Sequence, residues 1–382
     1  MSPLQRIITS LIATLAFCPP VAHAWNALGH KVIAEIAWQT LSPEKQSEIA
    51  DTLKRHPRYA EDFRDLETDQ EIFLHAATWP DIARGIRGPD RDKFDKPIWH
   101  YVNFPIGEGK TNLATNPKDS KSISWNVMQA TNFCESVINS EAPPQEKALA
   151  YSWLLHLVGD AHQPMHSTAL FSERFSKGDR GGNSIKLAKG QNLHSVWDNF
   201  IGRSHTLNNV RLKVFQLKSQ PEFWEVDTTG NIFDWIQESH KLAVEYAYDD
   251  AILNAIEGTE DIPPIVLPES YYKQAGEHAR ARVVAAGLRL GAMLGGKQEH
   301  IAKNQTTEPA YDSEVEDRSP LAAEPTSRVN AKADISSSPT TGYWLNTSSN
   351  VRHNPSCTNF KNTKRGRHCR PDEGKPCGIC GG

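Results

Sequence analysis

The stretch that decides the fold covers residues 153–166 and reads WLLHLVGDAHQPMH. His156 and Asp160 stand four residues apart, so both side chains leave the same face of one helix. Pro164 ends that helix, and His166 follows two residues later. Two imidazoles and a carboxylate so close together are typical of a zinc site with nitrogen and oxygen ligands. A single buried histidine is more often part of a core, so the metal interpretation needs further ligands elsewhere.

Two other places in the chain pair an imidazole with a carboxylate. His194 and Asp198 repeat the four-residue spacing in the segment HSVWD. Asp81 and His100 lie on either side of a predicted loop. Each pair alone is a weak signal. Together with residues 153–166 they favour a metal centre over isolated core histidines.

The composition is that of a globular protein with 382 residues and a formal net charge of -4. This length suits one large domain or two ordinary ones. The net charge is not strongly positive, as it usually is in proteins that bind duplex DNA. Nucleic acid is still compatible as a substrate, because bound metal ions can supply positive charge locally.

The first 24 residues have the pattern of a secretory signal peptide. Arg6 supplies the positive charge, residues 7–17 form the apolar core, and residues 22–24 are an A-x-A cleavage site. Cleavage there would make Trp25 the first residue, close to His30. No later stretch is apolar and long enough for a membrane span. We therefore expect an exported protein, periplasmic or extracellular.

Hydrophobic periodicity predicts a main body that is mostly helical. Residues 144–162 are apolar nearly all round, as in a helix buried in the middle of a bundle. Residues 84–97 and 177–182 read as loops, and a hairpin is expected only near residues 183–187. The other expected helices cover 27–41, a segment starting at Pro43, and 122–140, 194–201, 232–253 and 269–294.

The composition changes near residue 296. Residues 297–342 are rich in Ser, Thr, Pro and acidic residues, which indicates a disordered linker. Residues 343–382 form a small module with too few apolar residues to fold without cross-links. The module is compatible with a structural zinc ion or with two disulfides, through His353, Cys357, Cys369, Cys377 and Cys380.

Six short segments of the main body stand out together: WNALGH at Trp25, WPDIAR at Trp79, WHY at Trp99, HLVGDAHQPMH at His156, DRGGN at Asp179 and HSVWD at His194. In combination they resemble one family, the zinc-dependent, single-strand-preferring nucleases of the S1/P1 type. The resemblance covers residues 25–296. It implies an all-α fold, a single mostly helical domain around a cleft with three zinc ions, related to zinc-dependent phospholipase C.

The resemblance carries metal ligands over to nine positions of this chain. The ligands of one zinc ion match Asp81, His100, His156 and Asp160. Those of a second match His166, His194 and Asp198. The third matches the α-amino nitrogen and carbonyl oxygen of Trp25 with His30, and Asp160 bridges the first and third. The amine of Trp25 is free only after the signal peptide is removed.

Metal chemistry then gives the expected mechanism. Two zinc ions bridged by a carboxylate lower the pKa of a shared water to about 7, and the resulting hydroxide attacks phosphorus in line. Asp81 and Asp160 are therefore expected to be catalytic through the metals. The family resemblance implies endonuclease action on single-stranded DNA and RNA with 5′-phosphorylated products, and 3′-nucleotidase action on nucleotides.

Four positions are expected to contact substrate. Arg84 matches a basic position facing the phosphate, where a guanidinium can bind two phosphoryl oxygens and offset transition-state charge. Tyr101 can stack on a base, and Asn183 in DRGGN matches a substrate-orienting amide. Asn103 stands where some fungal members carry a base-reading Asp. Because an amide both donates and accepts, no adenine preference is implied.

Two other functions fit the same ligand set. A zinc-dependent phospholipase C acting on phosphatidylcholine-type lipids shares the fold, but the short spacing from Trp25 to His30, the DRGGN loop and Asp198 in place of Glu favour the nuclease. A catalytically idle zinc-binding or host-interaction protein would not need every ligand position filled. His162 matches no ligand and is expected to be structural. We expect a monomer.

Overall fold

The computed structural model describes residues 25–107, 125–257 and 262–300, and four short segments at 343–346, 351–353, 366–369 and 374–376. The chain divides into two compact units, Met1–Glu324 and Pro325–Gly382. The predicted signal peptide and most of the predicted linker lie outside the described residues. The boundaries of the four predicted regions stay predictions.

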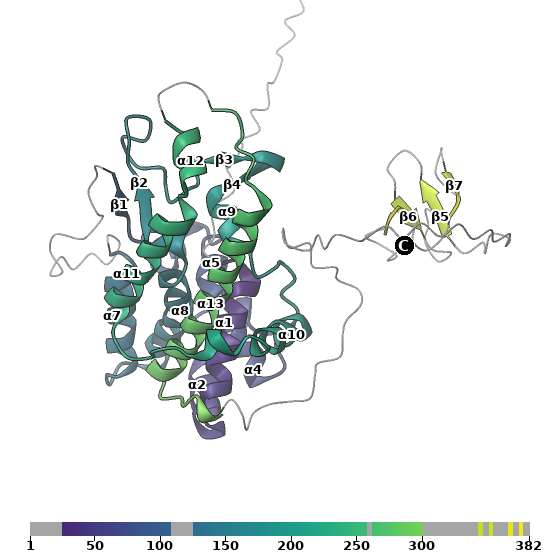
Figure 1. Ribbon diagram of the computed structural model, residues 1–382. Coiled ribbons are helices and arrows are strands. Elements are labelled where there is room, and N and C mark those ends of the chain that lie inside the picture. The colour runs from purple at the N-terminus through teal and green to yellow at the C-terminus, as the bar shows by residue number, and fades with distance from the viewer. Residues whose placement is uncertain are drawn as a thin grey trace, which may run out of the picture. The chain divides into compact units, whose positions relative to one another are not determined.

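The described part of the first unit is mostly helical, which confirms the all-α fold class (Figure 1). Its α-helices are α1 (Ala27–Thr40), α2 (Pro43–Leu53), α3 (Tyr59–Asp62), α4 (Asp69–Ala76), α5 (Trp79–Ala83), α6 (Arg91–Phe94), α7 (Val127–Ile138), α8 (Pro144–Ala161), α9 (Leu193–Asp198), α10 (Leu207–Lys218), α11 (Ile232–Leu242), α12 (Asp250–Ala255) and α13 (Glu269–Met293). Shorter helical turns are η1 (Gly88–Asp90), η3 (Pro164–His166), η4 (Ala188–Gly190), η5 (Pro221–Trp224) and η6 (Ala243–Ala247), a π-helix. None of the described helices is both long and apolar enough to cross a membrane.

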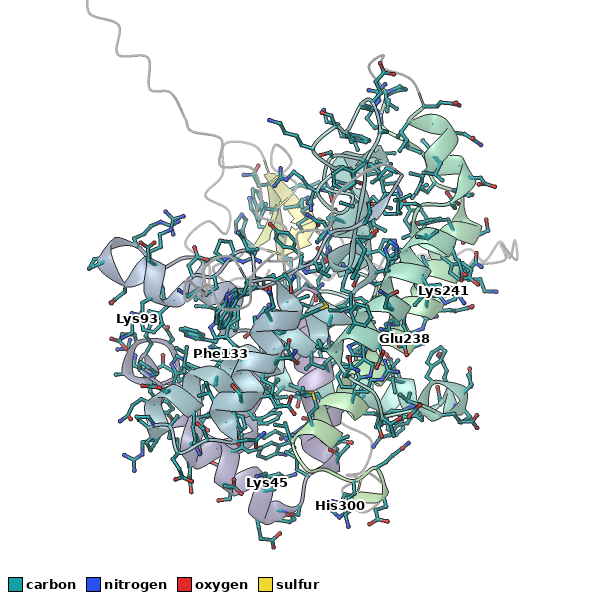
Figure 2. The ribbon with its side chains drawn as sticks, turned by 90° about the vertical axis from the view of Figure 1, so that its left-hand side faces the viewer. Lys45, Lys93, Phe133, Glu238, Lys241 and His300 are labelled. Carbon is teal, nitrogen blue, oxygen red and sulfur yellow. The ribbon has the colours of Figure 1, made fainter. Side chains whose placement is uncertain are left out.

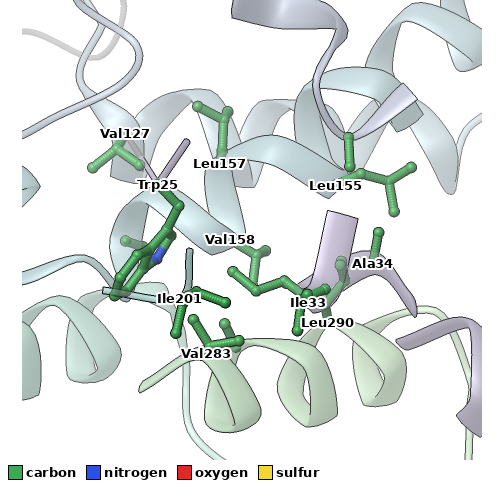
Figure 3. Close-up of a cluster of buried hydrophobic side chains, with 14 of the residues drawn as sticks. Trp25, Ile33, Ala34, Val127, Leu155, Leu157, Val158, Ile201, Val283 and Leu290 are labelled. Atoms are coloured by element: carbon green, nitrogen blue, oxygen red, sulfur yellow. The ribbon is translucent and has the colours of Figure 1, made fainter. Parts of the chain in front are cut away.

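Helix α8 lies at the centre of the first unit, as its apolar sequence predicts. It packs against α1, α2, α4, α5, α7, α11 and α13. Figure 3 shows the buried cluster around it, in which Leu155 and Val158 of α8 meet Ile33 of α1 and Val283 of α13. A helix fixed on all sides in this way holds the direction of every side chain that it carries.

Helices α1 and α13 pack closely because α13 places glycine at the contact. A Cβ at Gly287 would lie 2.6 Å from the Ile36 Cβ, and one at Gly291 would overlap the Thr40 hydroxyl. The glycines therefore let the two backbones approach where larger side chains would separate them. This contact fixes the position of α1, which carries His30.

A two-stranded parallel sheet, which the sequence did not predict, ties together two segments that follow histidines. Strand β1 (Phe104–Ile106) pairs with β2 (Thr168–Leu170) in the register Phe104↔Thr168. The Val102 amide donates to the His166 carbonyl oxygen at 2.9 Å. The pairing sets the chain after His100 beside the chain after His166. The expected hairpin is present as β3 (Lys186–Leu187) and β4 (Gln191–Asn192).

Two sequence predictions of local structure are wrong. Residues 84–97 contain η1 and α6 rather than only loop, because Phe94 is buried against Trp79. The expected helix 232–253 is broken at Tyr248, whose hydroxyl donates to Asp179 while Asp249 caps α12. In both cases contacts with distant residues outweigh local periodicity. Helix α10 was not predicted.

The described part of the second unit is a four-stranded sheet in the order β7-β5-β6-β8. Its strands are β5 (Tyr343–Asn346), β6 (Val351–His353), β7 (Gly366–Cys369) and β8 (Lys375–Pro376). Leu345, His353 and Cys369 are buried. Cys357, Cys377 and Cys380 lie outside the described residues, so a structural zinc ion and disulfides both stay predictions.

Candidate metal centre

Helix α8 presents His156 and Asp160 on one face, as their spacing predicts. The His156 Nε2 lies 3.3 Å from an Asp160 carboxylate oxygen. His30 of α1 stacks on His156 with ring centroids 3.9 Å apart, and its Nε2 lies 3.4 Å from Asp160. All three side chains are fully buried. Two helices therefore converge on one carboxylate.

Asp81 and His100 reach the same place from α5 and from the chain before β1. The His100 Nδ1 lies 3.0 Å from Asp160 Oδ2 and 3.0 Å from the His156 Nε2. An Asp81 oxygen lies 4.0 Å from the His156 Nε2. These side chains form two overlapping groups of close ligand atoms: His30, Asp81 and His156, and His100, His156 and Asp160.

A second group lies where η3 meets α9. The Nε2 atoms of His166 and His194 are 3.1 Å apart, and the His194 Nε2 lies 3.6 Å from Asp198. The three side chains offer ligand atoms within 4.8 Å of one another. Asn192 caps α9 and so fixes the helix start from which His194 and Asp198 project.

Hydrogen bonds to the backbone orient three of these imidazoles. The Nδ1 atoms of His156, His166 and His194 donate to the carbonyl oxygens of Ala77, His100 and Gly181, at 2.8, 2.6 and 2.7 Å. A carbonyl oxygen can only accept, so each Nδ1 carries a proton, and in the neutral ring each Nε2 presents a lone pair. Metal-binding histidines are held in this way.

The arrangement fits a cation. The lone pairs of His166 and His194 face each other at 3.1 Å, which is repulsive unless a positive charge lies beside them. Both ring nitrogens of His30, the His100 Nε2 and one Asp160 oxygen are buried with no hydrogen-bond partner among the described residues. An unsatisfied buried polar group costs about 1–3 kcal/mol. Imidazole and carboxylate donors at such distances suit zinc.

Burial and charge set the protonation of the cluster. Burial lowers the pKa of His100 and of His166 to about 4, so both rings are neutral near pH 7. Burial also acts to lower the pKa of His156, but the carboxylates of Asp160 and Asp81 outweigh it and raise that pKa. Burial raises the pKa of Asp198 well above its usual range. A metal cation would favour the ionised form of Asp198.

Trp25 is built into the same centre. Its indole nitrogen donates to the Gly159 carbonyl oxygen at 3.1 Å, next to Asp160 in the chain. The Asn26 amide donates to the Asp198 carbonyl oxygen at 3.2 Å. Gly159 leaves room for His30, because a Cβ there would lie 2.9 Å from the His30 Nδ1. The predicted mature N-terminus is thus anchored beside both groups.

A pocket of about 600 Å³ borders the centre. His166 and His194 form part of its lining. All four residues expected to contact substrate line it as well: Arg84, Tyr101, Asn103 and Asn183. The Arg84 Nε lies 3.3 Å from an Asp81 oxygen, which places this guanidinium at the metal end of the pocket.

Comparison with known proteins identifies the family. The model of the S1/P1 nuclease family matches residues 25–297. The chain belongs to the S1/P1 nuclease family. It is 22% identical over 313 residues to nuclease S1 of Aspergillus oryzae. The alignment covers 76% of this chain and 97% of that protein. It is 25% identical over 309 residues to endonuclease 4 of Arabidopsis thaliana, covering 72% of this chain and 89% of the relative. The resemblance stated from the motifs is confirmed.

Gln163 is a site residue that the sequence interpretation missed. Its side-chain amide donates to an Asp198 oxygen at 2.6 Å, and its Oε1 accepts from the Met165 amide at 2.6 Å. The side chain is fully buried. A polar residue between ligands, inside an apolar segment, is a signal that could have drawn attention to it.

His162 faces away from the centre, as expected for a structural histidine. Its Nδ1 donates to the Val158 carbonyl oxygen at 2.7 Å, and its Nε2 accepts from Arg289 at 3.0 Å. Arg282 and Arg289 are both buried and pair with Glu238 of α11, labelled in Figure 2. This arginine cluster, Glu238, Arg282 and Arg289, packs behind the end of α8.

Proposed function

We propose that this protein is an exported, zinc-dependent nuclease that hydrolyses single-stranded DNA and RNA to 5′-phosphorylated products. Membership of the S1/P1 nuclease family supports hydrolysis of nucleic acids. The three-zinc centre, the 3′-nucleotidase activity, the monomeric state and the periplasmic or extracellular location belong to the same proposal.

The strongest support is the orientation of the buried imidazoles. Three rings hold their Nδ1 protons on backbone carbonyls and turn their Nε2 lone pairs toward carboxylates and toward one another. Structural histidines have no need for such an arrangement, whereas metal ligands do. The centre borders a pocket wide enough for a substrate.

The ligand assignment is the one that the family resemblance implies, and the close contacts among these side chains support it. One zinc ion would be held by Asp81, His100, His156 and Asp160, a second by His166, His194 and Asp198, and a third by the Trp25 backbone, His30 and Asp160. Zinc ions held there would supply a hydroxide nucleophile near neutral pH and would offset negative charge on the phosphate.

The protein side chains would position the substrate. Arg84 is anchored by Asp81 and only 13% exposed, so its guanidinium is preorganised to bind two phosphoryl oxygens. Tyr101 offers a ring on which a base can stack, a contact worth about 1–3 kcal/mol. Asn103 and Asn183 offer amides that donate and accept at the rim.

The test is release of acid-soluble nucleotides from single-stranded DNA and RNA by zinc-loaded protein that begins at Trp25. A phosphatidylcholine assay runs beside it, and both are repeated with a chelator. We expect chelator-sensitive release of 5′-phosphorylated products and no lipid cleavage. Lipid cleavage with intact nucleic acid would assign the centre to a phospholipase C instead. No hydrolysis of either substrate would support the idle zinc-binding protein.

A further inference from the structure

The pocket gathers positive charge in a chain that is acidic overall. Its lining holds four arginines and one carboxylate, while the whole chain has a formal net charge of -4. The four arginines are Arg84, Arg87, Arg91 and Arg180. Such a concentration of one sign of charge in a concave site attracts ligands of the opposite sign. The pocket is therefore suited to a polyanion.

Arg84 is set apart from the other three by its place at the metal end. It is largely buried and lies beside Asp81. A single phosphodiester carries one negative charge, which Arg84 and the proposed zinc ions would already offset. Arg87, Arg91 and Arg180 thus provide more positive charge than one phosphate requires.

These three arginines come from two separate segments of the chain that both line the pocket. Arg87 and Arg91 follow Arg84 along η1 and α6, and a guanidinium nitrogen of Arg87 donates to the Arg84 carbonyl oxygen at 2.8 Å. The Arg91 Nε lies 3.6 Å from Asp95, whose side chain is only 9% exposed. Both contacts restrict the side chains without using all of the guanidinium donors. This segment is partly preorganised for an anion.

Arg180 comes from the second segment, residues 179–183, and has a strained backbone conformation. Its φ is 64°, in the left-handed region where residues other than glycine are uncommon. The buried Asp179 holds this loop, accepting from the amides of Leu170 and Gly182 at 2.9 and 2.8 Å. Its guanidinium has no hydrogen bond or ion pair with another described side chain. Strain of this kind is concentrated at functional sites.

We propose that Arg87, Arg91 and Arg180 bind phosphate groups of the substrate that neighbour the phosphate that is cleaved. These contacts are available to a strand of several nucleotides and not to a single nucleotide. This inference rests on the proposed nuclease function and adds the residues that hold the strand beside the cleaved phosphate. Arg84 serves the cleaved phosphate, and the other three arginines serve its neighbours.

The experiment compares a 3′-mononucleotide with a thymidine strand of about 15 nucleotides, near the upper end of single-strand site sizes. The variant carries Arg87→Gln, Arg91→Gln and Arg180→Gly, and glycine relieves the positive φ rather than adding strain. The matched control is Arg64→Gln. Arg64 is 71% exposed and lies 3.6 Å from Asp65, like Arg91 from Asp95, but does not line the pocket.

We expect the triple variant to lose at least about tenfold in kcat/KM on the strand, mainly through KM, with less than about a twofold change on the mononucleotide. The slope of log(kcat/KM) against log[salt] should become less steep by about 0.7 for each lost phosphate contact. Arg64→Gln should change neither. Equal losses on both substrates, or no loss on the strand, would overturn the inference.

A binding assay separates this inference from the proposed function. Fluorescence anisotropy of a labelled thymidine strand measures binding to the chelator-treated full chain, in which the proposed hydrolysis is stopped. If the wild type cleaves nothing but binds the strand more tightly than the triple variant does, the nuclease proposal fails and the phosphate site stands. If wild type and triple variant bind the strand equally, the phosphate site fails.

Discussion

His156, within α8, and His162, at its C-terminal end, show how the surroundings of a buried histidine decide its role. His156 and His162 are both fully buried, and both donate their Nδ1 proton to a backbone carbonyl oxygen. The Nε2 of His162 accepts from Arg289. The Nε2 of His156 faces the carboxylates of Asp160 and Asp81.

The difference lies in what each neighbour can donate. A guanidinium satisfies the lone pair of His162, and the charges of Arg282 and Arg289 add to burial in lowering the pKa of His162 well below its usual range. Ionised carboxylates cannot donate to His156, and the nearby His100 Nδ1 also faces Asp160, so the Nε2 of His156 is best satisfied by a cation. One imidazole is thus locked into a structural network, and the other is available to a metal.

The largest expected effect comes from replacing His156. His156→Ala should abolish binding of at least one zinc ion and lower kcat/KM by at least about 10³-fold, since metal stabilisation of the transition state is worth several kcal/mol. Zinc content by atomic absorption and nuclease assays measure both. The control is His162→Gln, which should keep its zinc. Full activity of His156→Ala would refute the metal mechanism.

A smaller effect is expected where Gln163 supports Asp198. Gln163→Glu would set a second carboxylate against Asp198 and remove the 2.6 Å hydrogen bond. Loss of such a supporting contact lowers metal affinity by about 10–100-fold. Competition with a chelator measures the affinity. Gln46→Glu is the control, because Gln46 donates to the Trp38 carbonyl oxygen away from the centre. An unchanged zinc affinity in Gln163→Glu would show that the contact is incidental.

For the arginine cluster, the expected change is in the free energy of unfolding alone. Glu238→Gln leaves two buried guanidiniums without their carboxylate and should cost about 1–3 kcal/mol of unfolding free energy, since Glu238 itself is partly exposed. Thermal denaturation measures the loss. Glu245→Gln, which breaks only the exposed pair with Lys241, should have almost no effect. Loss of zinc from Glu238→Gln would mean that the arginine cluster and the metal centre are coupled.

The smallest effect is expected from acidification of chelator-treated protein. The pKa of His100 and of His166 is lowered to about 4, so the unfolded chain takes up protons between pH 6.5 and 4 that the folded protein does not. Stability should therefore fall as the pH falls through that range. The raised pKa values of His156 and Asp198 act in the opposite direction and reduce the change. A Tm lower by a few degrees at pH 5 than at pH 7 is expected; a constant or rising Tm would contradict it.

Much of the centre could be predicted from short-range spacing. The four-residue separations of His156 from Asp160 and of His194 from Asp198 place each pair on one helical face whatever the rest of the chain does. The apolar character of residues 144–162 likewise predicts that α8 lies in the middle of the bundle. Whether these residues bind zinc as assigned stays a prediction.

Contacts between distant segments could not be predicted in this way. No local pattern indicates that β1 pairs with β2, that Tyr248 interrupts a helix to reach Asp179, or that Phe94 turns a glycine-rich loop into helix. Each depends on the combined packing of elements far apart in the sequence, where many alternatives have similar local propensity.

The sequence by itself therefore determined the family, the helical fold class and the residue types that converge on α8. Only the tertiary structure decided which imidazole nitrogen each histidine presents, that Gln163 supports Asp198, and that arginines from two segments line one pocket. The physical reason is one of range. Helical periodicity acts over a few residues, whereas the direction of a buried lone pair or charge is set by whichever distant group the packed core places against it.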